Sequence, residues 1–321
     1  MRIGICAALQ VDTTVHARGF LHGVLVAACA LPGIRRAQLT FFDDGAGAEG
    51  GAQAADAFLR ARVDAVVGHF ASASAAAAID RYEAAGIPLL LPASTRAQLT
   101  RRGGTAFRIC ASDDLIARHL VEVLRSHGVR RVWLDGDDSL HGRSQLEALH
   151  AALGPDAPTR LASSAGADAI VYCGRLRASR IYLETQRALG NRAPIYFTDD
   201  AASGALVAGI AAPGPVYVVS FPVRPVDAHH PAAAAYAALF HRPPLLYAME
   251  TVAAFAAIEQ AANSSLSMLA ALRTETFSTP LGRIRFVDGE NRYSSVSLWH
   301  ADGDELKEST TLAPLDSVQA L

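Results

Sequence analysis

The sequence lacks the charge pattern on which nucleic-acid binding depends. Its 29 basic and 31 acidic side chains give a formal net charge of −2, and no block of like charges interrupts the chain. A protein that neutralises phosphates needs a basic stripe or patch. We therefore expect no nucleic-acid partner.

Long apolar runs are missing as well. The most apolar stretch, at 24–31, is too short to cross a bilayer, so we expect no direct membrane insertion. The first residues, MRIGICAAL, lead straight into a strand-like pattern without the basic segment and cleavage site of a signal peptide. Two interpretations stay open: a cytoplasmic protein, or a periplasmic protein whose signal peptide is absent from this chain.

Cysteine and histidine are present without metal-binding spacing. The four cysteines lie far apart in apolar runs, with no CxxC, and the eleven histidines include no HExxH. This pattern is typical of buried free thiols. We expect no disulfide scaffold, no metal and no cofactor.

What the sequence does contain is an alternation of short β-like runs and longer helical patterns. With 321 residues, of which 51% are hydrophobic, the chain suits two globular domains. The first half alternates through 2–9, 17–31, 38–44, 54–62, 64–69, 74–86 and 87–93. The pattern restarts at 129–137 and continues through 144–154, 168–174, 178–190, 194–200 and 215–222, before a helical stretch at 245–263 and a β-rich end at 282–303. This order predicts an α/β protein with two parallel-sheet lobes and a ligand cleft between them.

Two short motifs suggest a dinucleotide-binding loop and a catalytic serine, but their contexts favour neither. GAGAEG at 45–50 satisfies G-x-G-x-x-G, but it follows the second strand and is preceded by Asp43 and Asp44, which would repel a pyrophosphate. A small-residue turn is the better interpretation. GHFASAS at 68–74 lacks the glycines of a nucleophile elbow, and no base is in register with Ser72. We expect no catalytic residue and no enzyme.

Hydroxyl residues at strand ends suggest binding of a zwitterion. Ser72 and Thr95, with Ala93, follow two predicted strands, where short donors and helix N-termini favour a carboxylate. FTDD at 197–200 places Asp199 and Asp200 after another strand, where an acid could accept from an ammonium group. Helix capping explains each residue alone, whereas a zwitterion explains the set.

The segment 64–103, with its GH-x-x-S, PAST and LT-x-RG motifs, resembles the periplasmic binding proteins for leucine, isoleucine and valine. FRICASDD, DAIVYCG, PIYFTDD and TPLGRIRFVDGE follow in the order expected of that family. The resemblance implies the type I periplasmic-binding fold, with two Rossmann-like lobes joined by three hinge crossings near 113, 244 and 293. The lobes would comprise 1–113 with 245–292, and 114–244 with 293–321.

The resemblance also implies a binding site. It assigns the α-carboxylate and α-amino contacts to Ser72, Ala93 and Thr95, with Ser94 beside them, and the closing acid to Asp200. The remaining pocket positions fall on His16, His141, Arg175 and Tyr247, where the family has aromatic residues. Arg175 would pair with Glu250 or a neighbouring acid, meet a polar or anionic part of the ligand, or point to solvent. The family's disulfide in the first lobe is absent.

The expected function is therefore capture of an amino acid or a similar small molecule, with hinge closure, for delivery to an ABC-transporter permease in the periplasm. The alternative is a cytoplasmic sensor of amides or amino-acid-like molecules that has the same fold and regulates gene expression.

Overall fold

The computed structural model describes residues 1–321 except 11–13, 15, 101–103, 156 and 313–321. Part of the LT-x-RG motif, at 101–103, lies outside the described residues. The chain divides into two compact units, residues 1–112 with 223–294 and residues 113–222 with 295–321.

Residues 223–244 lie in the first unit, whereas the sequence analysis assigned them to the second. The helix α8 (Pro231–Phe240) causes the difference, because it packs against α1 (Ala17–Ala30). The Tyr236 hydroxyl lies 2.9 Å from His22 Nδ1 and accepts from the Leu245 N–H at 3.0 Å. The alanine-rich helix was not singled out in the sequence.

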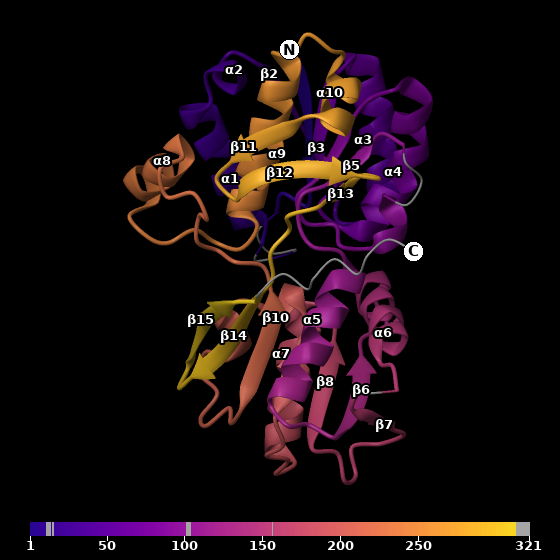
Figure 1. The fold of residues 1–321 in the computed structure, drawn as a ribbon, viewed down its shortest axis with the longest axis vertical. Helices are drawn as coiled ribbons and strands as arrows, with labels where there is room; N and C mark the ends of the chain where they lie inside the picture. Colours follow the sequence, from indigo (N-terminus) through magenta and orange to yellow (C-terminus); the bar gives the residue numbers. More distant parts are fainter. Residues whose placement is uncertain (11–13, 15, 101–103, 156, 313–321) are drawn as a thin grey trace. The chain divides into compact units, whose positions relative to one another are not determined.

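The first unit is built on an eight-stranded sheet in the order β11-β12-β13-β5-β4-β3-β1-β2 (Figure 1). Its neighbouring strands pair in parallel from β13 to β2, and β12 runs antiparallel to β11 and β13. Its further elements are β1 (Arg2–Ala7), α2 (Pro32–Arg35), β2 (Gln38–Asp43), α3 (Ala48–Ala61), β3 (Ala65–Gly68), α4 (Ser72–Ala85), β4 (Leu89–Leu91), η1 (Ala97–Leu99), β5 (Ala106–Arg108), α9 (Ala248–Ala262), α10 (Met268–Thr274), β11 (Thr276–Thr279), β12 (Gly282–Val287) and β13 (Glu290–Asn291).

The central strands β1, β3 and β4 are apolar and buried on both faces, because both faces of this part of the sheet are covered by helices. Ile5 packs with residues of α1 and α9, whereas Cys6 packs with residues of α3 and α4. Leu90 and Leu91 divide in the same way. Successive strand residues point to opposite faces, so the continuous apolar runs of the sequence fill two cores.

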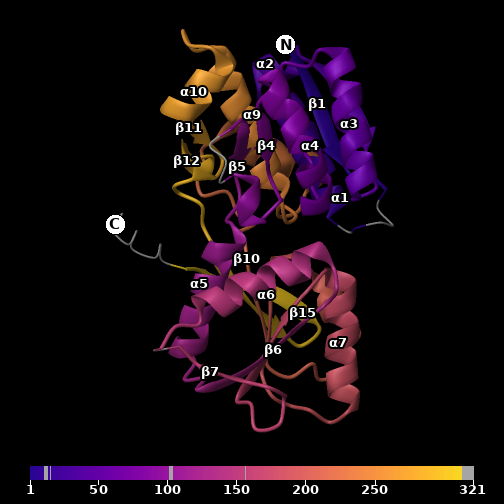
Figure 2. The same ribbon diagram turned by 90° about the vertical axis from the view of Figure 1, so that its right-hand side faces the viewer.

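The second unit has a seven-stranded sheet in the order β15-β14-β10-β9-β8-β6-β7 (Figure 1), and Figure 2 shows the helices α5 and α7 on opposite sides of this sheet. Neighbouring strands from β10 to β7 pair in parallel, and β14 and β15 add an antiparallel edge. Its elements are α5 (Asp113–Ser126), β6 (Arg131–Gly136), α6 (Leu140–Ala152), β7 (Thr159–Leu161), β8 (Ala169–Cys173), α7 (Leu176–Ala188), β9 (Ile195–Phe197), η2 (Asp199–Ala201), η3 (Gly204–Leu206), β10 (Val216–Ser220), β14 (Ser297–Asp302) and β15 (Glu305–Thr311). The predicted α/β class is confirmed.

Candidate functional site

The ends of β3 and β4 bring the two predicted carboxylate-binding segments together. The strands pair in parallel with Val67 opposite Leu90, and the segments that contain Ser72 and Thr95 follow them. Gly68 ends β3 with φ +122°, where an added Cβ would lie 1.9 Å from the Cys6 carbonyl oxygen. Glycine permits this close turn, so the local sequence fixes where β3 leaves the sheet.

Thr95 carries a buried hydroxyl that lacks a hydrogen-bond partner. The residue is 1% exposed, and its Oγ1 has no partner among the described residues. Leaving a buried hydroxyl unpaired costs about 1–3 kcal/mol, and such groups are rare enough to need a cause. A bound ligand that forms a hydrogen bond with the Thr95 hydroxyl would explain why this group is left unpaired in the protein.

Ser94, although adjacent, is engaged within the protein. Its hydroxyl donates to the carbonyl oxygens of His69 at 2.7 Å and Phe70 at 3.1 Å. Ser94 therefore ties the segment after β4 to the segment after β3. Ala93 is buried beside it.

The N-terminus of α4 offers free backbone donors. Its N-cap residue, Ala71, has no side chain that could cap the helix, and the first helical bond runs from the Ala75 N–H to the Ala71 carbonyl at 3.0 Å. The N–H groups of Ser72 and Ala73 have no acceptor within the described part of the chain. A helix N-terminus with open donors favours an anion, in agreement with a carboxylate at this edge.

An aromatic group lies in the same unit. The ring of Tyr247 meets those of His16 and Phe70 edge to face, with centroids 5.2 and 4.8 Å away. Tyr247 is buried and has φ +67°, a backbone conformation that costs a non-glycine residue about 1–2 kcal/mol. Strain of this kind clusters at binding sites, which agrees with the predicted role of Tyr247.

Beneath this edge lies a buried polar network centred on Asp44. Its Oδ2 accepts from Ser74 Oγ at 2.5 Å and from Cys6 Sγ at 3.4 Å. Because the Ser74 hydroxyl donates to Asp44, it accepts from His69 Nδ1 at 2.7 Å, and His69 Nε2 lies 2.8 Å from the Tyr82 hydroxyl. Burial raises the pKa of Asp44, but the nearby His69 ring and the hydrogen bonds from Ser74 and the Ala46 N–H outweigh it and keep that pKa below its ordinary value.

Three members of this network could be metal ligands. The ligand atoms of Cys6, Asp44 and His69 lie within 4.8 Å of one another. Zinc would require a Cys6 thiolate, whereas burial, followed by the nearby Asp44 charge, raises the pKa of this thiol well above its ordinary value. Each ligand atom already has a hydrogen-bond partner. The group is therefore a satisfied hydrogen-bond network that joins the ends of β1, β2 and β3.

The corresponding edge of the second unit carries acids. Four carboxylates lie near strand ends or helix starts: Asp113, Asp137, Asp199 and Asp200. Asp137 accepts from the Arg175 N–H at 2.8 Å, and Asp200 accepts from the Leu176 N–H at 2.7 Å. The first two N–H groups of the α7 region are thus occupied by acids, and Asp200, the predicted ligand acid, has a capping role.

A single amide links two of these acids. The side-chain NH2 of Gln145 donates to Asp113 at 2.9 Å and to Asp199 at 2.7 Å. His141 Nε2 lies 3.5 Å from Asp199 Oδ1. Burial opposes protonation of His141, but Asp199, Asp200 and the other two acids together raise its pKa above the ordinary value.

Of the predicted site residues in the second unit, His141 and Arg175 lie in different surroundings. His141 lies among these acids, whereas Arg175 is exposed and its backbone N–H donates to Asp137. Sequence reasoning missed Asp113, Asp137 and Gln145. The rule that singled out Asp200, a polar residue just after a strand, would also have found Asp137 in GDD.

Comparison with known proteins agrees with this architecture. Residues 22–181 match the family model described as a periplasmic binding protein. A leucine binding protein from Thermotoga maritima superposes with a TM-score of 0.83 at 19% identity, over 98% of this chain and 99% of that one. The chain has the type I periplasmic-binding fold. The resemblance predicted from its sequence is confirmed.

One protein is similar to part of this chain in sequence, and a second solved structure is similar to it in fold. An amino acid binding protein from Pseudomonas aeruginosa is 36% identical over 94 residues, which are 28% of this chain and about a quarter, 24%, of that protein. A solute binding protein of an ABC transporter from R. palustris, solved with benzoate, has a TM-score of 0.77 at 14% identity, over 97% of this chain and 95% of that one. None of the described helices combines the length and apolar character that a membrane span needs.

Proposed function

We propose that this protein binds a small α-amino acid or a close relative, without turnover, as the solute-binding component of an ABC transporter. The observation that carries the proposal is the Thr95 hydroxyl, buried and without a partner among the described residues, at the same sheet edge as the open N-terminus of α4. A carboxylate supplies the acceptor that this hydroxyl and these N–H groups lack.

The acids of the second unit support binding of the ammonium group of a zwitterion. Its edge carries four acids, and the Thr198 hydroxyl beside Asp199 is also buried without a partner within the described residues. Ammonium groups need acceptors and a negative potential. We assign this role to Asp199 together with Asp200, because Asp199 is the more deeply buried of the two and lies beside His141.

The relatives support an amino acid over a simple acid. The Thermotoga maritima protein is named for leucine and the R. palustris protein was solved with benzoate, two ligands that share a carboxylate. Only the amino acid also carries an ammonium group. The acids of the second unit would have no counterpart in benzoate, and the P. aeruginosa relative is named an amino acid binding protein.

Binding without turnover fits the first unit. His69, the histidine nearest to Ser72 along the chain, is not available as its general base, because both ring nitrogens of His69 are occupied by Ser74 and Tyr82. The protein would work outside the cytoplasm and hand its ligand to a membrane permease. The remaining candidate positions, His16, Arg175 and Tyr247, would select the ligand side chain.

The test is a thermal-shift and calorimetry screen that uses matched probes. L-Leucine and the other L-amino acids are compared with the corresponding amines and carboxylic acids. Ligand at about a hundred times Kd should stabilise the protein by about 2.7 kcal/mol. We expect a response to one or more amino acids, and a much weaker response to either half alone. A response to carboxylic acids that the amino group does not improve would contradict the zwitterion model.

A further inference from the structure

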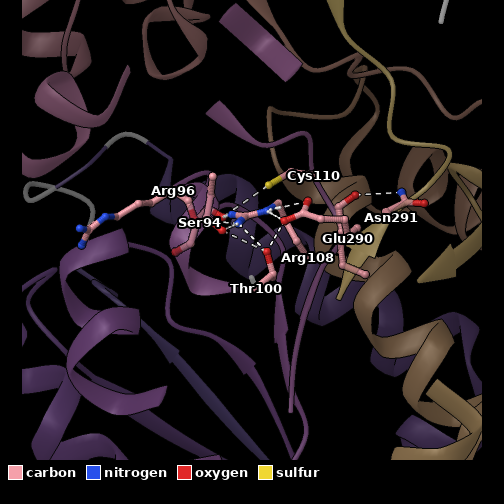
Figure 3. Close-up of polar contacts among 9 residues, drawn as sticks. Ser94, Arg96, Thr100, Arg108, Cys110, Glu290 and Asn291 are labelled. Carbon is pink, nitrogen blue, oxygen red and sulfur yellow. Dashed lines mark hydrogen bonds and ion pairs between the residues drawn. The ribbon is translucent and has the colours of Figure 1, made fainter. Parts of the chain in front are cut away.

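A fully buried guanidinium, that of Arg108, lies beside the segment that contains Thr95. Arg108 is the last residue of β5, which pairs with β4, with Leu91 opposite Arg108. Its side chain is 0% exposed. Figure 3 shows it among Ser94, Thr100 and Glu290, with hydrogen bonds to all three.

The guanidinium binds the backbone on both sides of Thr95. Nη1 donates to the Ser94 carbonyl oxygen, and Nη2 donates to the Arg96 carbonyl oxygen at 2.7 Å. The hydroxyl of Ser94 is separately tied to the His69 carbonyl. The backbone of residues 94–96, which sets the position of Thr95, is therefore held at both neighbours by one side chain.

The positive charge is balanced within the same group. The Arg108 Nε lies 3.1 Å from both Glu290 carboxylate oxygens, and Nη2 lies 3.1 Å from Thr100 Oγ1, which itself donates to Glu290. The backbone N–H of Arg108 donates to the Gly289 carbonyl oxygen at 2.7 Å. The fork of donors of an arginine can satisfy all these acceptors at once, whereas the compact ammonium of a lysine cannot.

We infer that Arg108 is a positioning residue of the ligand site: it holds residues 94–96 so that the Thr95 hydroxyl is already in place before the ligand binds. The inference rests on the proposed function of Thr95. A preformed site avoids the cost of ordering a loop on binding, and here that preformation comes from a side chain that need not touch the ligand.

A second buried arginine provides a matched control. Arg187 donates to the carbonyl oxygens of Pro213, Asn191 and Ala193, which belong to segments that precede β10 and β9. It is buried and bound to backbone carbonyls, as Arg108 is, but at the amino ends of the strands. Arg187→Lys should cost stability without affecting the ligand.

The experiment compares Arg108→Lys with Arg187→Lys in the full chain. The first readout is amide hydrogen exchange without ligand, at Leu99 and Thr100, whose N–H groups donate to the Arg96 and Ala97 carbonyls. We expect faster exchange there in Arg108→Lys only. The second readout is Kd for the amino acid found in the screen, which should rise about tenfold or more in Arg108→Lys and stay within twofold in Arg187→Lys.

A double-mutant cycle separates positioning from general destabilisation. If Arg108 acts through Thr95, Arg108→Lys should raise Kd much less in a Thr95→Val background than in the wild type. Additive effects, or unchanged exchange at Leu99 and Thr100, would overturn the inference. Should Arg108→Lys fail to fold, Thr100→Val removes one partner of the guanidinium and is judged by the same readouts.

The two proposals fail in different ways. If the wild type binds no amino acid, the proposed function is wrong, and the exchange measurement decides whether Arg108 holds the 94–96 segment. If the wild type binds but Arg108→Lys binds equally well, the proposed function stands and the positioning role is wrong.

Discussion

The two helices α4 and α7 start at equivalent places and differ in what meets their first N–H groups. Each begins soon after a parallel strand, β3 or β8. At α7, the Arg175 and Leu176 N–H groups are bound by Asp137 and Asp200. At α4, no described residue accepts from Ser72 or Ala73.

This difference shows how one architecture can present opposite chemistries. The first unit leaves donors unpaired at the sheet edge, including the Thr95 hydroxyl, so the edge favours an anion. The second unit pairs its helix donors with its own acids and keeps an excess of carboxylates. The helix geometry is shared, and a few side chains decide the sign of the charge that each edge attracts.

The largest effect on stability is expected at the sheet edge of the second unit, where helix donors and acids are paired. Gln145→Leu removes the amide that donates to both Asp113 and Asp199 and so weakens the hydrogen bonding of two buried carboxylates, although Ser144 Oγ still donates to Asp113 at 2.5 Å. We expect a loss of about 3 kcal/mol or more in the free energy of unfolding, measured by urea denaturation. The control is Gln186→Leu, the same substitution at a partly exposed site in α7. Gln145→Glu would not serve as a control, because it adds a charge. A smaller loss of stability in Gln145→Leu than in Gln186→Leu would contradict a stabilising role of the Gln145 amide between Asp113 and Asp199.

At the sheet edge of the first unit, a substitution should reduce ligand binding and leave stability unharmed. Thr95→Val keeps the shape and removes a hydroxyl without a described partner, so the unliganded protein should be equally stable or more stable. Amino acid binding should weaken by about 1.5–3 kcal/mol, or roughly ten- to a hundred-fold in Kd, measured by calorimetry.

Thr105→Val is the matched control for this experiment. Thr105 also has a buried hydroxyl without a partner in the described chain, but it precedes β5 at the amino ends of the strands. It should show the same stability change and no change in Kd. Equal loss of binding in both variants would contradict a ligand contact at Thr95.

A smaller effect should come from the cap of α7. Asp200→Asn weakens the bond from the Leu176 N–H, and loss of such a cap typically costs about 1 kcal/mol in the free energy of unfolding. If Asp200 also contacts the ammonium group, Kd rises as well. Stability that is lost without any change in Kd would restrict Asp200 to capping and leave the ligand contact to Asp199.

The smallest effect should be the pH dependence from His141. Its pKa is raised in the folded state, because the attraction of the surrounding acids exceeds the cost of burial. The stabilisation is therefore fully present below the unfolded pKa of about 6.5 and is lost as pH rises through the folded value. His141→Gln should lower the free energy of unfolding more at pH 5.5 than at pH 9. An equal loss at both would show that His141 is not charged by its neighbours.

The sequence by itself determined the α/β class, the strand order along the chain, and the segments that carry Ser72, Thr95 and Asp200. These follow from apolar runs, helical periodicity and polar residues at strand ends, all of which are local. One assignment from the sequence was wrong. The alanine-rich α8 was assigned to the wrong unit, because its sequence does not show that it packs on α1.

Only the tertiary structure decided which hydroxyls and acids are free to bind. Ser94 and Thr95 are neighbours of similar chemistry, yet one is bound to the His69 carbonyl and the other has no described partner. Cys6, Asp44 and His69 meet because three parallel strands end together. Hydrogen-bond partners far apart in the chain are set by sheet register and helix packing, which no local pattern encodes, and they divide the structural residues from those left for a ligand.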